Sequence, residues 1–306
     1  MAAKKQAPAI LCGGIAVQDI LMRVEHFPAP GTKVSASDFV VTGGGCAANA
    51  AVAVARLGGR AAFAGPLGGA GDAVSDRILR DLAAEGVDCT HVVRVPDANA
   101  SVSLILIDAA GEKAIATRRG QHLAAAVPAD AEAAVAETDV LLVDNRFPEF
   151  VRPLCEAARR RAIPVVIDGD KATTQDDPLL ALGSHVIFSA EALRGTTGIE
   201  DPRCALQHMG RRLAGFLSVT DGPNGVFWLH DGAIRHQPAF AIEAVDTLGA
   251  GDTFHAAFAL ALGRGEPVDA AMRFAAAAAA LKCLRFGGNA GTPTAAELDA
   301  FLRTRG

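Results

Sequence analysis

The sequence has few of the features on which several common classes of protein depend. Its 306 residues include no Tyr and a single Trp, so it offers few aromatic side chains on which nucleic-acid bases could stack. Acidic residues (34) outnumber basic ones (29), which gives a formal net charge of −5. This balance excludes the broad basic surface that most non-specific nucleic-acid binders need. We expect a small-molecule ligand and no nucleic-acid partner.

The six cysteines lie far apart in the sequence, with no C-x-x-C pair and no His/Cys spacing typical of a zinc site. Such a pattern favours a reduced, cytoplasmic protein over a disulfide-rich secreted one. An apolar stretch runs from residue 7 to 17, but Pro8, Gly13 and Gly14 interrupt it, so we interpret it as a first β-strand and not as a signal peptide. Because no segment approaches the roughly 18 apolar residues of a membrane-spanning helix, we expect no membrane association.

Short apolar runs alternate with amphipathic stretches along most of the chain. Strands are predicted at residues 10–12, 61–64, 140–143, 164–167, 185–188 and 216–219, and helices at residues 72–85, 149–161, 202–213, 251–263, 268–284 and 294–303. Alternation of this kind predicts a mainly parallel sheet with helices on both faces, in a single domain over residues 1–306.

Two β-rich segments interrupt this alternation, at about residues 20–42 and 100–120. Turn residues divide each of them into short strands, at Pro28–Gly31 in the first and at Ala109–Gly111 in the second. We expect both segments to join in one small antiparallel sheet, inserted into the α/β body as a lid or as a dimer contact.

The segment from Asp246 to Phe254 has the sequence DTLGAGDTF and precedes a predicted helix. Gly249 and Gly251 let backbone N–H groups close around an oxyanion, and the helix dipole favours a negative charge there. Asp252 follows at the mouth of that site, where its carboxylate could accept a proton from a hydroxyl nucleophile, as phosphoryl transfer requires. The alternative is an ordinary helix N-cap, for which Asp is also common.

A second glycine-rich segment, GGGCAAN from Gly43 to Asn49, opens another helical stretch. Its glycines let a ligand approach the backbone, and the Asn49 amide suits hydroxyl groups. The segment loosely matches a dinucleotide-binding fingerprint, but the next strand ends without the acidic residue that such a site uses. No G-x-x-x-x-G-K-[ST] sequence is present, which excludes a P-loop.

A third segment, Thr220–Gly225, is by itself typical of a turn.

In their order and separation, the segments Gly43–Asn49 and Asp246–Asp252 resemble the two signatures of the ribokinase-like (PfkB) sugar kinases. The similarity extends from about residue 10 to residue 291. This resemblance implies a three-layer α/β/α sandwich with a mainly parallel central sheet and a small antiparallel β lid. It also implies an enzyme that uses ATP and forms a homodimer through the lid.

The resemblance further implies a role for each matching residue. The catalytic positions would be the general base Asp252 and, as anion hole for the γ-phosphate, Gly249, Ala250 and Gly251. The sugar hydroxyls would be held by Asp19, Gly43, Gly44 and Asn49. The nucleotide would be faced by Thr220, Gly222, Gly225 and Thr247, with the Ala-rich stretch 268–284 closing over adenine.

Two cations are implied in the same way. A monovalent cation, K⁺, would lie beside Asp246 and Thr247, as in many relatives. Mg²⁺ would accompany ATP, but the Asn-x-x-Glu motif that orients its bound water is replaced here by FSAEAL at Phe188–Leu193, which lacks the Asn. Glu191 is the residue that could take over this role.

Within the family, several segments resemble the sulfofructose kinase and ketohexokinase branch, namely Gly43–Gly45, Asp168–Asp170, His236–Phe240, Phe254–His255 and Ala280–Cys283. By this resemblance Arg146 would hold the anionic end of the sugar, because a guanidinium fork suits a sulfonate or phosphate. The alternative for Arg146 is a surface arginine. Arg118 or its neighbour Arg119, in the second β-rich segment, would either contact the same anion or be a solvated charge on an edge strand.

The sequence therefore predicts an ATP-dependent kinase for the primary hydroxyl of a small ketose with an anionic end, such as sulfofructose or a sugar phosphate. The alternatives are a neutral-sugar ketohexokinase or fructokinase and a nucleoside kinase. Outside the enzymes, a sugar-binding regulator without catalysis is the alternative.

Overall fold

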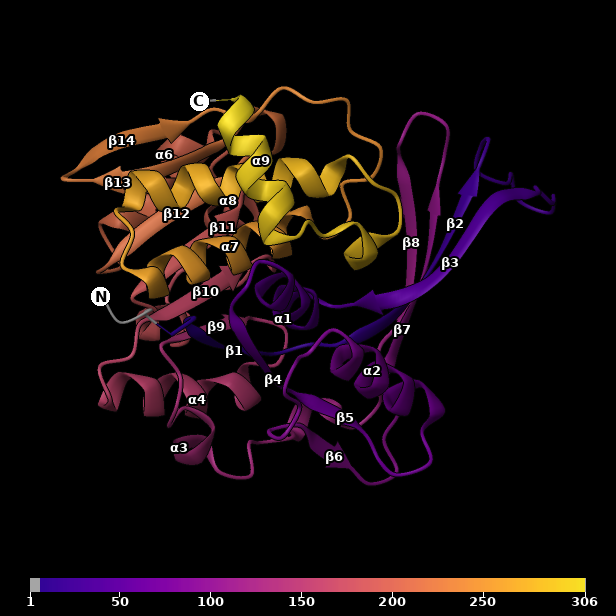
Figure 1. The fold of residues 1–306 in the computed structure, drawn as a ribbon, viewed down its shortest axis with the longest axis horizontal. Coiled ribbons are helices and arrows are strands. Elements are labelled where there is room, and N and C mark those ends of the chain that lie inside the picture. The colour runs from indigo at the N-terminus through magenta and orange to yellow at the C-terminus, as the bar shows by residue number, and fades with distance from the viewer. Residues whose placement is uncertain (1–5, 306) are drawn as a thin grey trace.

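The computed structural model describes residues 6–305, and its centre is an eight-stranded sheet (Figure 1). The strands follow the order β14-β13-β12-β11-β10-β9-β1-β4. In chain order they are β1 (Ala9–Gly13), β4 (Arg60–Ala64), β9 (Val140–Asp144), β10 (Val165–Gly169), β11 (His185–Ser189), β12 (Phe216–Thr220), β13 (Val226–His230) and β14 (Ala233–Gln237). The strands from β4 to β12 pair in parallel, and β13 and β14 add an antiparallel edge.

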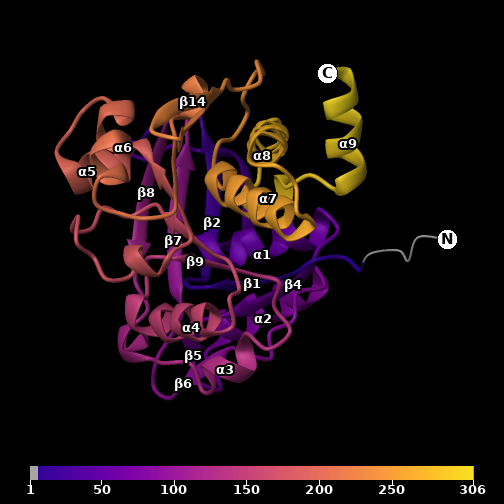
Figure 2. The same ribbon diagram turned by 90° about the vertical axis from the view of Figure 1, so that its left-hand side faces the viewer.

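Helices cover both faces of the sheet and bury two separate apolar clusters (Figure 2). One face carries α1 (Cys46–Arg56), α2 (Ala73–Ala84), α7 (Ala250–Arg264), α8 (Val268–Cys283) and α9 (Ala295–Thr304). The other carries α3 (Ala131–Ala134), α4 (Pro148–Arg160), α5 (Ala190–Thr197) and α6 (Pro202–Gly210). Strands β9 and β10 are buried over their whole length, as expected of parallel strands covered on both sides. The predicted three-layer sandwich is confirmed.

A smaller four-stranded sheet, the lid, projects from this body (Figure 1). Its strand order is β3 (Ala36–Gly44), β2 (Val17–Val24), β7 (Ser101–Ile107) and β8 (Lys113–Arg118). It consists of two antiparallel hairpins, as predicted, whose first strands β2 and β7 pair in parallel. The parallel pair arises because both excursions leave the body at the same edge, so their first strands run outward side by side.

The remaining elements are short. They are the strands β5 (Pro66–Gly68) and β6 (Val93–Val95) and the 3₁₀ helices η1 (Leu123–Ala125), η2 (Leu180–Leu182), η3 (Gly222–Asn224) and η4 (Gly288–Gly291). Over residues 6–305, no helix combines the length and the apolar character needed to cross a bilayer.

Candidate functional site

The predicted site residues gather at one edge of the central sheet. Strands β1, β9, β10, β11 and β12 are parallel, so their carboxyl ends meet at that edge. The lid begins there, directly after β1. Helices α1 and α7 start there as well. Ala47 of α1 donates a hydrogen bond to Asp144 at the end of β9, and Asn49 of α1 donates one to Asp252 of α7. In open α/β sheets this edge is where ligands bind.

The N-terminus of α7 presents unpaired donors. Gly249 adopts a left-handed φ of 78° and caps the helix without a side-chain hydrogen bond. Within the described chain, the backbone N–H groups of Gly251 and Asp252 have no hydrogen-bond acceptor. Asp252 lies in the first turn but does not cap it, so the N-cap alternative for this residue is wrong. Free N–H groups at a helix N-terminus form a binding site for an anion.

The N-terminus of α1 is different, because the protein itself satisfies its donors. The buried Asp144 carboxylate accepts hydrogen bonds from the backbone N–H groups of Ala47 at 3.1 Å and of Ile15 at 2.8 Å. The N–H of Ala48 donates to the Ile15 carbonyl at 3.3 Å. This glycine-rich segment therefore positions side chains, whereas the one before α7 offers its backbone. Asp144 was not predicted, although an acidic residue at the end of a wholly apolar strand was a usable signal.

Asp252 and Asn49 meet across the site. The Asn49 Nδ2 of α1 donates a hydrogen bond to Asp252 Oδ2 at 2.6 Å. Burial raises the pKa of Asp252 to about 7, although the Asn49 hydrogen bond lowers it and nearby carboxylates such as Asp170 raise it. A carboxylate with a pKa near neutrality is suited to act as a general base. Asn49 was predicted to bind sugar hydroxyls, and its contact with Asp252 gives it a second role.

Further acidic side chains surround Asp252. The Cys46 thiol and the carboxylates of Asp168 and Asp252 lie within 4.8 Å of one another. Arg146, at the end of β9, forms an ion pair with Asp170, at the end of β10, and is thus at this site rather than on a remote surface. Burial, followed by the charges of Asp170 and Asp252, raises the pKa of Asp168. The single arginine is therefore outnumbered by carboxylates.

A buried histidine borders this cluster. His255 Nδ1 lies 2.6 Å from the Gly251 carbonyl oxygen, and its Nε2 lies 3.3 Å from the Ile187 carbonyl oxygen and 3.4 Å from Asp168 Oδ1. Burial lowers the pKa of His255. This imidazole therefore lies between the first turn of α7 and the strands β10 and β11.

The lid contributes Asp19 on its inner face. Burial raises the pKa of Asp19 to about 6, while the Ser103 hydroxyl lowers it. A Cβ atom on Gly44 would lie only 2.0 Å from Asp19 Oδ2, so any larger residue would displace this carboxylate. A Cβ atom on Gly43, one residue earlier on β3, would lie 2.8 Å from Asn289 Nδ2. Asp19 and Gly44 thus lie together where the lid joins the body, whereas Gly43 pairs with Gln18 on the opposite face.

The lid register does not support the predicted contact between Arg118 and the substrate. In the lid register Ser103 pairs with Asp19 and Thr117, whereas Arg118 pairs with Val102. Side chains of directly paired residues share a face of the sheet, and neighbours along a strand alternate. Arg118 therefore lies on the face of the lid that is turned away from Asp19. A shift of one residue in a strand is enough to exchange the two faces.

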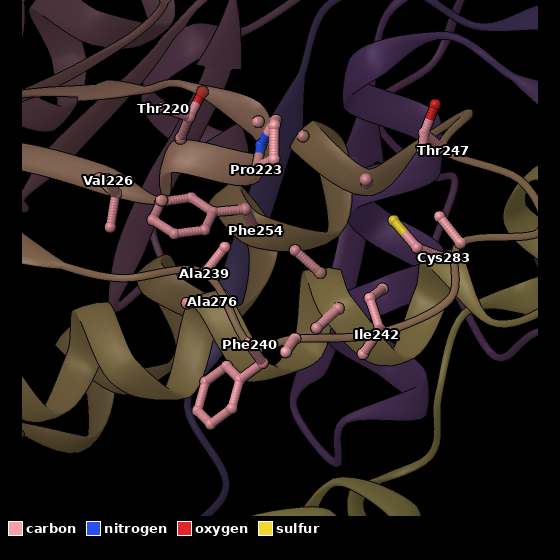
Figure 3. A pocket seen from close by; sticks show the side chains of 18 residues that line it. Thr220, Pro223, Val226, Ala239, Phe240, Ile242, Thr247, Phe254, Ala276 and Cys283 are labelled. Atoms are coloured by element: carbon pink, nitrogen blue, oxygen red, sulfur yellow. The ribbon is translucent and has the colours of Figure 1, made fainter. Parts of the chain in front are cut away.

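A cavity of about 640 Å³ lies beside the N-terminus of α7 (Figure 3). The predicted nucleotide residues all line it, together with Ala250 and Gly251 of the proposed anion hole; they are Thr220, Gly222, Gly225 and Thr247. Helix α8 contributes Ala276, Ala279, Ala280 and Cys283, as expected of the Ala-rich stretch. Small side chains and the rings of Phe240 and Phe254 leave a mostly apolar space, suited to a flat heterocycle.

The two predicted cation ligands have different surroundings. Asp246 is buried and pairs with the Lys282 ammonium, whose Nζ is 3.3 Å from Asp246 Oδ2. This lysine was not predicted as a site residue, although it is a lone charge near the end of a helix otherwise rich in alanine. Glu191 is exposed in the first turn of α5, after β11, and makes no ion pair or hydrogen bond with any residue in the range 6–305.

Comparison with known proteins finds related sequences over nearly the whole chain. A sequence profile described as pfkB family carbohydrate kinase matches residues 7–295. The chain is 30% identical over 292 residues to a ribokinase of Haemophilus influenzae, which covers 93% of this chain and 95% of that one. It is 29% identical over 292 residues to a ribokinase of Bacillus subtilis, covering 94% and 97%.

Solved structures agree with the sequences. A candidate ribokinase from Agrobacterium tumefaciens superposes with a TM-score of 0.93 at 37% identity and covers 98% of both chains. The ribokinase of Arabidopsis thaliana, solved in complex with ribose and ATP, superposes with a TM-score of 0.84 at 26% identity and covers 97% of this chain and 99% of that one.

Proposed function

Because this chain belongs to the pfkB family of carbohydrate kinases and is an ATP-dependent sugar kinase, we propose that Asp252 is the base that activates the sugar hydroxyl. The observation that carries this assignment is the position of the carboxylate in the first turn of α7, next to unpaired backbone N–H groups. A sugar hydroxyl close to Asp252 would also be close to an anion bound at those donors. Base and anion hole are thus arranged for in-line transfer of a phosphoryl group.

Each part of the site has a task in this reaction. The N–H groups of Gly251 and Asp252 and the dipole of α7 stabilise the negative charge on the γ-phosphate as it is transferred. Asp252 takes the proton of the attacking hydroxyl. Asn49 orients that carboxylate through its 2.6 Å hydrogen bond. Asp19, on the lid, accepts hydrogen bonds from sugar hydroxyls. The lid excludes water from the site when it covers the sugar.

ATP would occupy the cavity between η3 and α8, with its base against the alanines of α8 and its phosphates toward Gly251. Mg²⁺ prefers carboxylate and phosphate oxygens and keeps several of its waters. The free, exposed carboxylate of Glu191 fits this chemistry through such a water. When bound, Mg²⁺ neutralises charge on the phosphates.

For the sugar, we propose a neutral pentose such as ribose. The acidic side chains around the site bear on this choice, because Asp19, Asp170 and Asp252 repel an anion and Arg146 is already paired with Asp170. The relatives named above, which are ribokinases, support the same choice. An anionic ketose is the second candidate, and the observation that favours it is the location of Arg146 beside the proposed sugar site.

The two candidates are distinguished by ATP consumption of the purified protein with ribose, deoxyribose, fructose, fructose 6-phosphate, 6-deoxy-6-sulfofructose and adenosine. We expect kcat/KM to be at least about tenfold higher for ribose than for either anionic ketose, which corresponds to about 1.4 kcal/mol. Preference for an anionic ketose would reverse the assignment of substrate. No turnover of any sugar, with ATP still bound, would contradict the proposed reaction and favour a sugar-binding regulator.

Arg146→Ala tests whether Arg146 contacts an anion. The substitution removes a cation and leaves Asp170 unpaired, so we expect KM for either anionic ketose to rise at least about tenfold and KM for ribose to change less than about threefold. Steady-state kinetics with both classes of sugar measure this. Arg152→Ala is the matched control, because Arg152 is exposed on α4 and pairs only with Glu149. An equal rise for neutral and anionic sugars would show that Arg146 does not recognise charge.

The outer face of the lid is apolar, and we propose that a second copy of this chain covers it. In the lid register Ile20, Leu104 and Ala116 lie side by side on the face opposite Asp19. Leu104, on β7, is 40% exposed, and Phe39, which pairs with Met22 from the edge strand β3, is 57% exposed. Large exposed residues gathered on one face are typical of a protein–protein interface.

Leu104→Lys is therefore expected to convert a dimer into a monomer, because it would bury an unpaired charge in the interface. Light scattering at about 10 µM protein should give twice 31.3 kDa for the wild type and 31.3 kDa for the variant. Val127→Lys is the control, since Val127 is also exposed, at 57%, but lies outside the lid. A wild-type mass of one chain would contradict the proposed dimer.

A further inference from the structure

Helix α8 carries a lysine whose entire side chain is buried. Lys282 lies in the last turn of α8 and, like its partner Asp246, has no exposed side-chain surface. Its Nζ donates a hydrogen bond to the Asp246 carbonyl oxygen at 3.0 Å and lies 3.3 Å from Asp246 Oδ2. Because removing a lysine from water is costly, such a residue is rarely found without a paired charge.

Asp246 links Lys282 to the segments around the nucleotide cavity. Its Oδ1 accepts a hydrogen bond from the backbone N–H of Leu248 at 2.8 Å, and its Oδ2 accepts from those of Gly287 and Gly288 at 3.1 Å each. Burial raises the pKa of Asp246, but the Lys282 ammonium and the backbone donors lower it more, so the net shift is downward. The carboxylate is therefore ionised at neutral pH and needs a counter-ion.

The pair lies directly behind the anion-binding turn. A Cβ atom on Gly249 would be 4.0 Å from Lys282 Cε and 3.7 Å from Asp252 Oδ2, so the lysine and the base flank the same residue. Across the described part of the chain, Lys282 is the one cationic side chain within 4.0 Å of the Asp246 carboxylate. The ammonium therefore acts on the turn through the Asp246 carboxylate, which accepts the hydrogen bond of the Leu248 N–H.

We propose that Lys282 is a positioning residue that acts as a built-in monovalent cation, fixing the Asp246–Gly251 turn in the shape that binds the γ-phosphate and making added K⁺ unnecessary. This inference rests on the proposed function. It replaces the K⁺ site that the resemblance implies beside Asp246 and Thr247. A tethered ammonium is held next to its carboxylate whatever salt is present, and in this dry environment the attraction between the two charges is strong.

The first test uses the wild-type protein in buffers whose only monovalent cation is K⁺, Na⁺ or tetramethylammonium. We expect kcat to agree within about twofold in all three, because the cation is already part of the chain. Activation by K⁺ of about tenfold or more over tetramethylammonium would overturn the inference and leave the kinase assignment intact.

The second test is Lys282→Met, which removes the charge and keeps much of the side-chain volume. In tetramethylammonium we expect kcat to fall about 10- to 30-fold, and about 100 mM K⁺ or NH₄⁺ to restore at least a third of it, since a small cation can then bind Asp246. A residue that only packs would give no such rescue. Lys33→Met is the matched control, because Lys33 is exposed in the loop between β2 and β3.

Thermal unfolding provides a readout that needs no sugar. The melting temperature of Lys282→Met should rise with K⁺ or NH₄⁺ and not with tetramethylammonium, whereas that of the wild type should not respond. If Lys282→Met fails to fold, the neutral pair Asp246→Asn/Lys282→Met takes its place and should be poorly active in every buffer.

These outcomes separate this inference from the proposed function. A wild-type protein inert toward every sugar would contradict the proposed function, while the melting temperatures would still decide on Lys282. Full activity of either variant without a small cation would overturn the inference.

Discussion

Replacing Asp252 by Asn is expected to lower kcat by about 10²–10⁴ and to leave the affinity for ATP nearly unchanged. The Asn side chain has almost the same volume, and its oxygen can still accept the hydrogen bond from Asn49 Nδ2, so the site keeps its shape. What is lost is the group that we propose takes the proton from the attacking hydroxyl. The loss is bounded because, in a loose transition state, alignment and the anion hole contribute more than the base.

Steady-state turnover and calorimetric ATP binding measure the two halves of this prediction. Asp269→Asn is the matched control, since Asp269 also lies in the first turn of a helix, α8, but is exposed. The pKa of Asp252 is raised in the folded state, so ionising this carboxyl destabilises the fold as pH rises toward 7. At pH 8 the melting temperature of Asp252→Asn should therefore be no lower than that of the wild type. Turnover within threefold of the wild type would contradict the assignment.

The pH profile is a second readout of the same assignment. Only the ionised carboxylate can accept a proton, so a pKa of about 7 for Asp252 implies that kcat/KM for the sugar rises through pH 7 and then levels off. Asn49→Ala removes a donor that stabilises the ionised form, so the rising limb should move to higher pH. A flat profile between pH 6 and 8 would argue against Asp252 as the base.

Elements of the fold that depend only on short stretches of sequence could be predicted. Wholly apolar runs such as Val140–Val143 have only one place in an α/β protein, the centre of a parallel sheet, and they form β9 and its neighbours. Residues 72–85 were predicted as a helix, and α2 spans Ala73–Ala84 with Asp72 as its side-chain cap. The hairpin of β13 and β14 was missed, although Asp231-Gly232 between two apolar runs is a recognised hairpin signal.

The glycine-rich parts of the site were predictable for the same local reason, but the contacts between them were not. Asn49 and Asp252 are 203 residues apart, and their hydrogen bond depends on α1 and α7 starting at one edge of the sheet. The Lys282–Asp246 pair likewise depends on how α8 returns past the turn. The face on which Arg118 lies depends on lid register, and composition gives no information about register.

Gly251→Val is expected to lower kcat/KM for ATP by a factor of about 10²–10³ without loss of stability. A Cβ atom on Gly251 would meet no other atom within 4 Å, and its backbone has no positive φ, so the fold leaves room for a side chain. That room is part of the cavity wall at the N-terminus of α7, where the N–H groups are unpaired. A side chain there would keep a phosphate from reaching those donors.

The physical contrast with Gly249 makes this test selective for function. Gly249 has a φ of 78°, so Gly249→Ala should lower the melting temperature through backbone strain of about 1 kcal/mol, as Gly86→Ala should at a site remote from the cavity with the same φ. Gly251→Ala and Gly251→Val should instead melt close to the wild type while ATP kinetics worsen in step with side-chain size. Normal kinetics for both Gly251 variants would mean that phosphate does not approach this turn, because nothing else in the fold requires a glycine there.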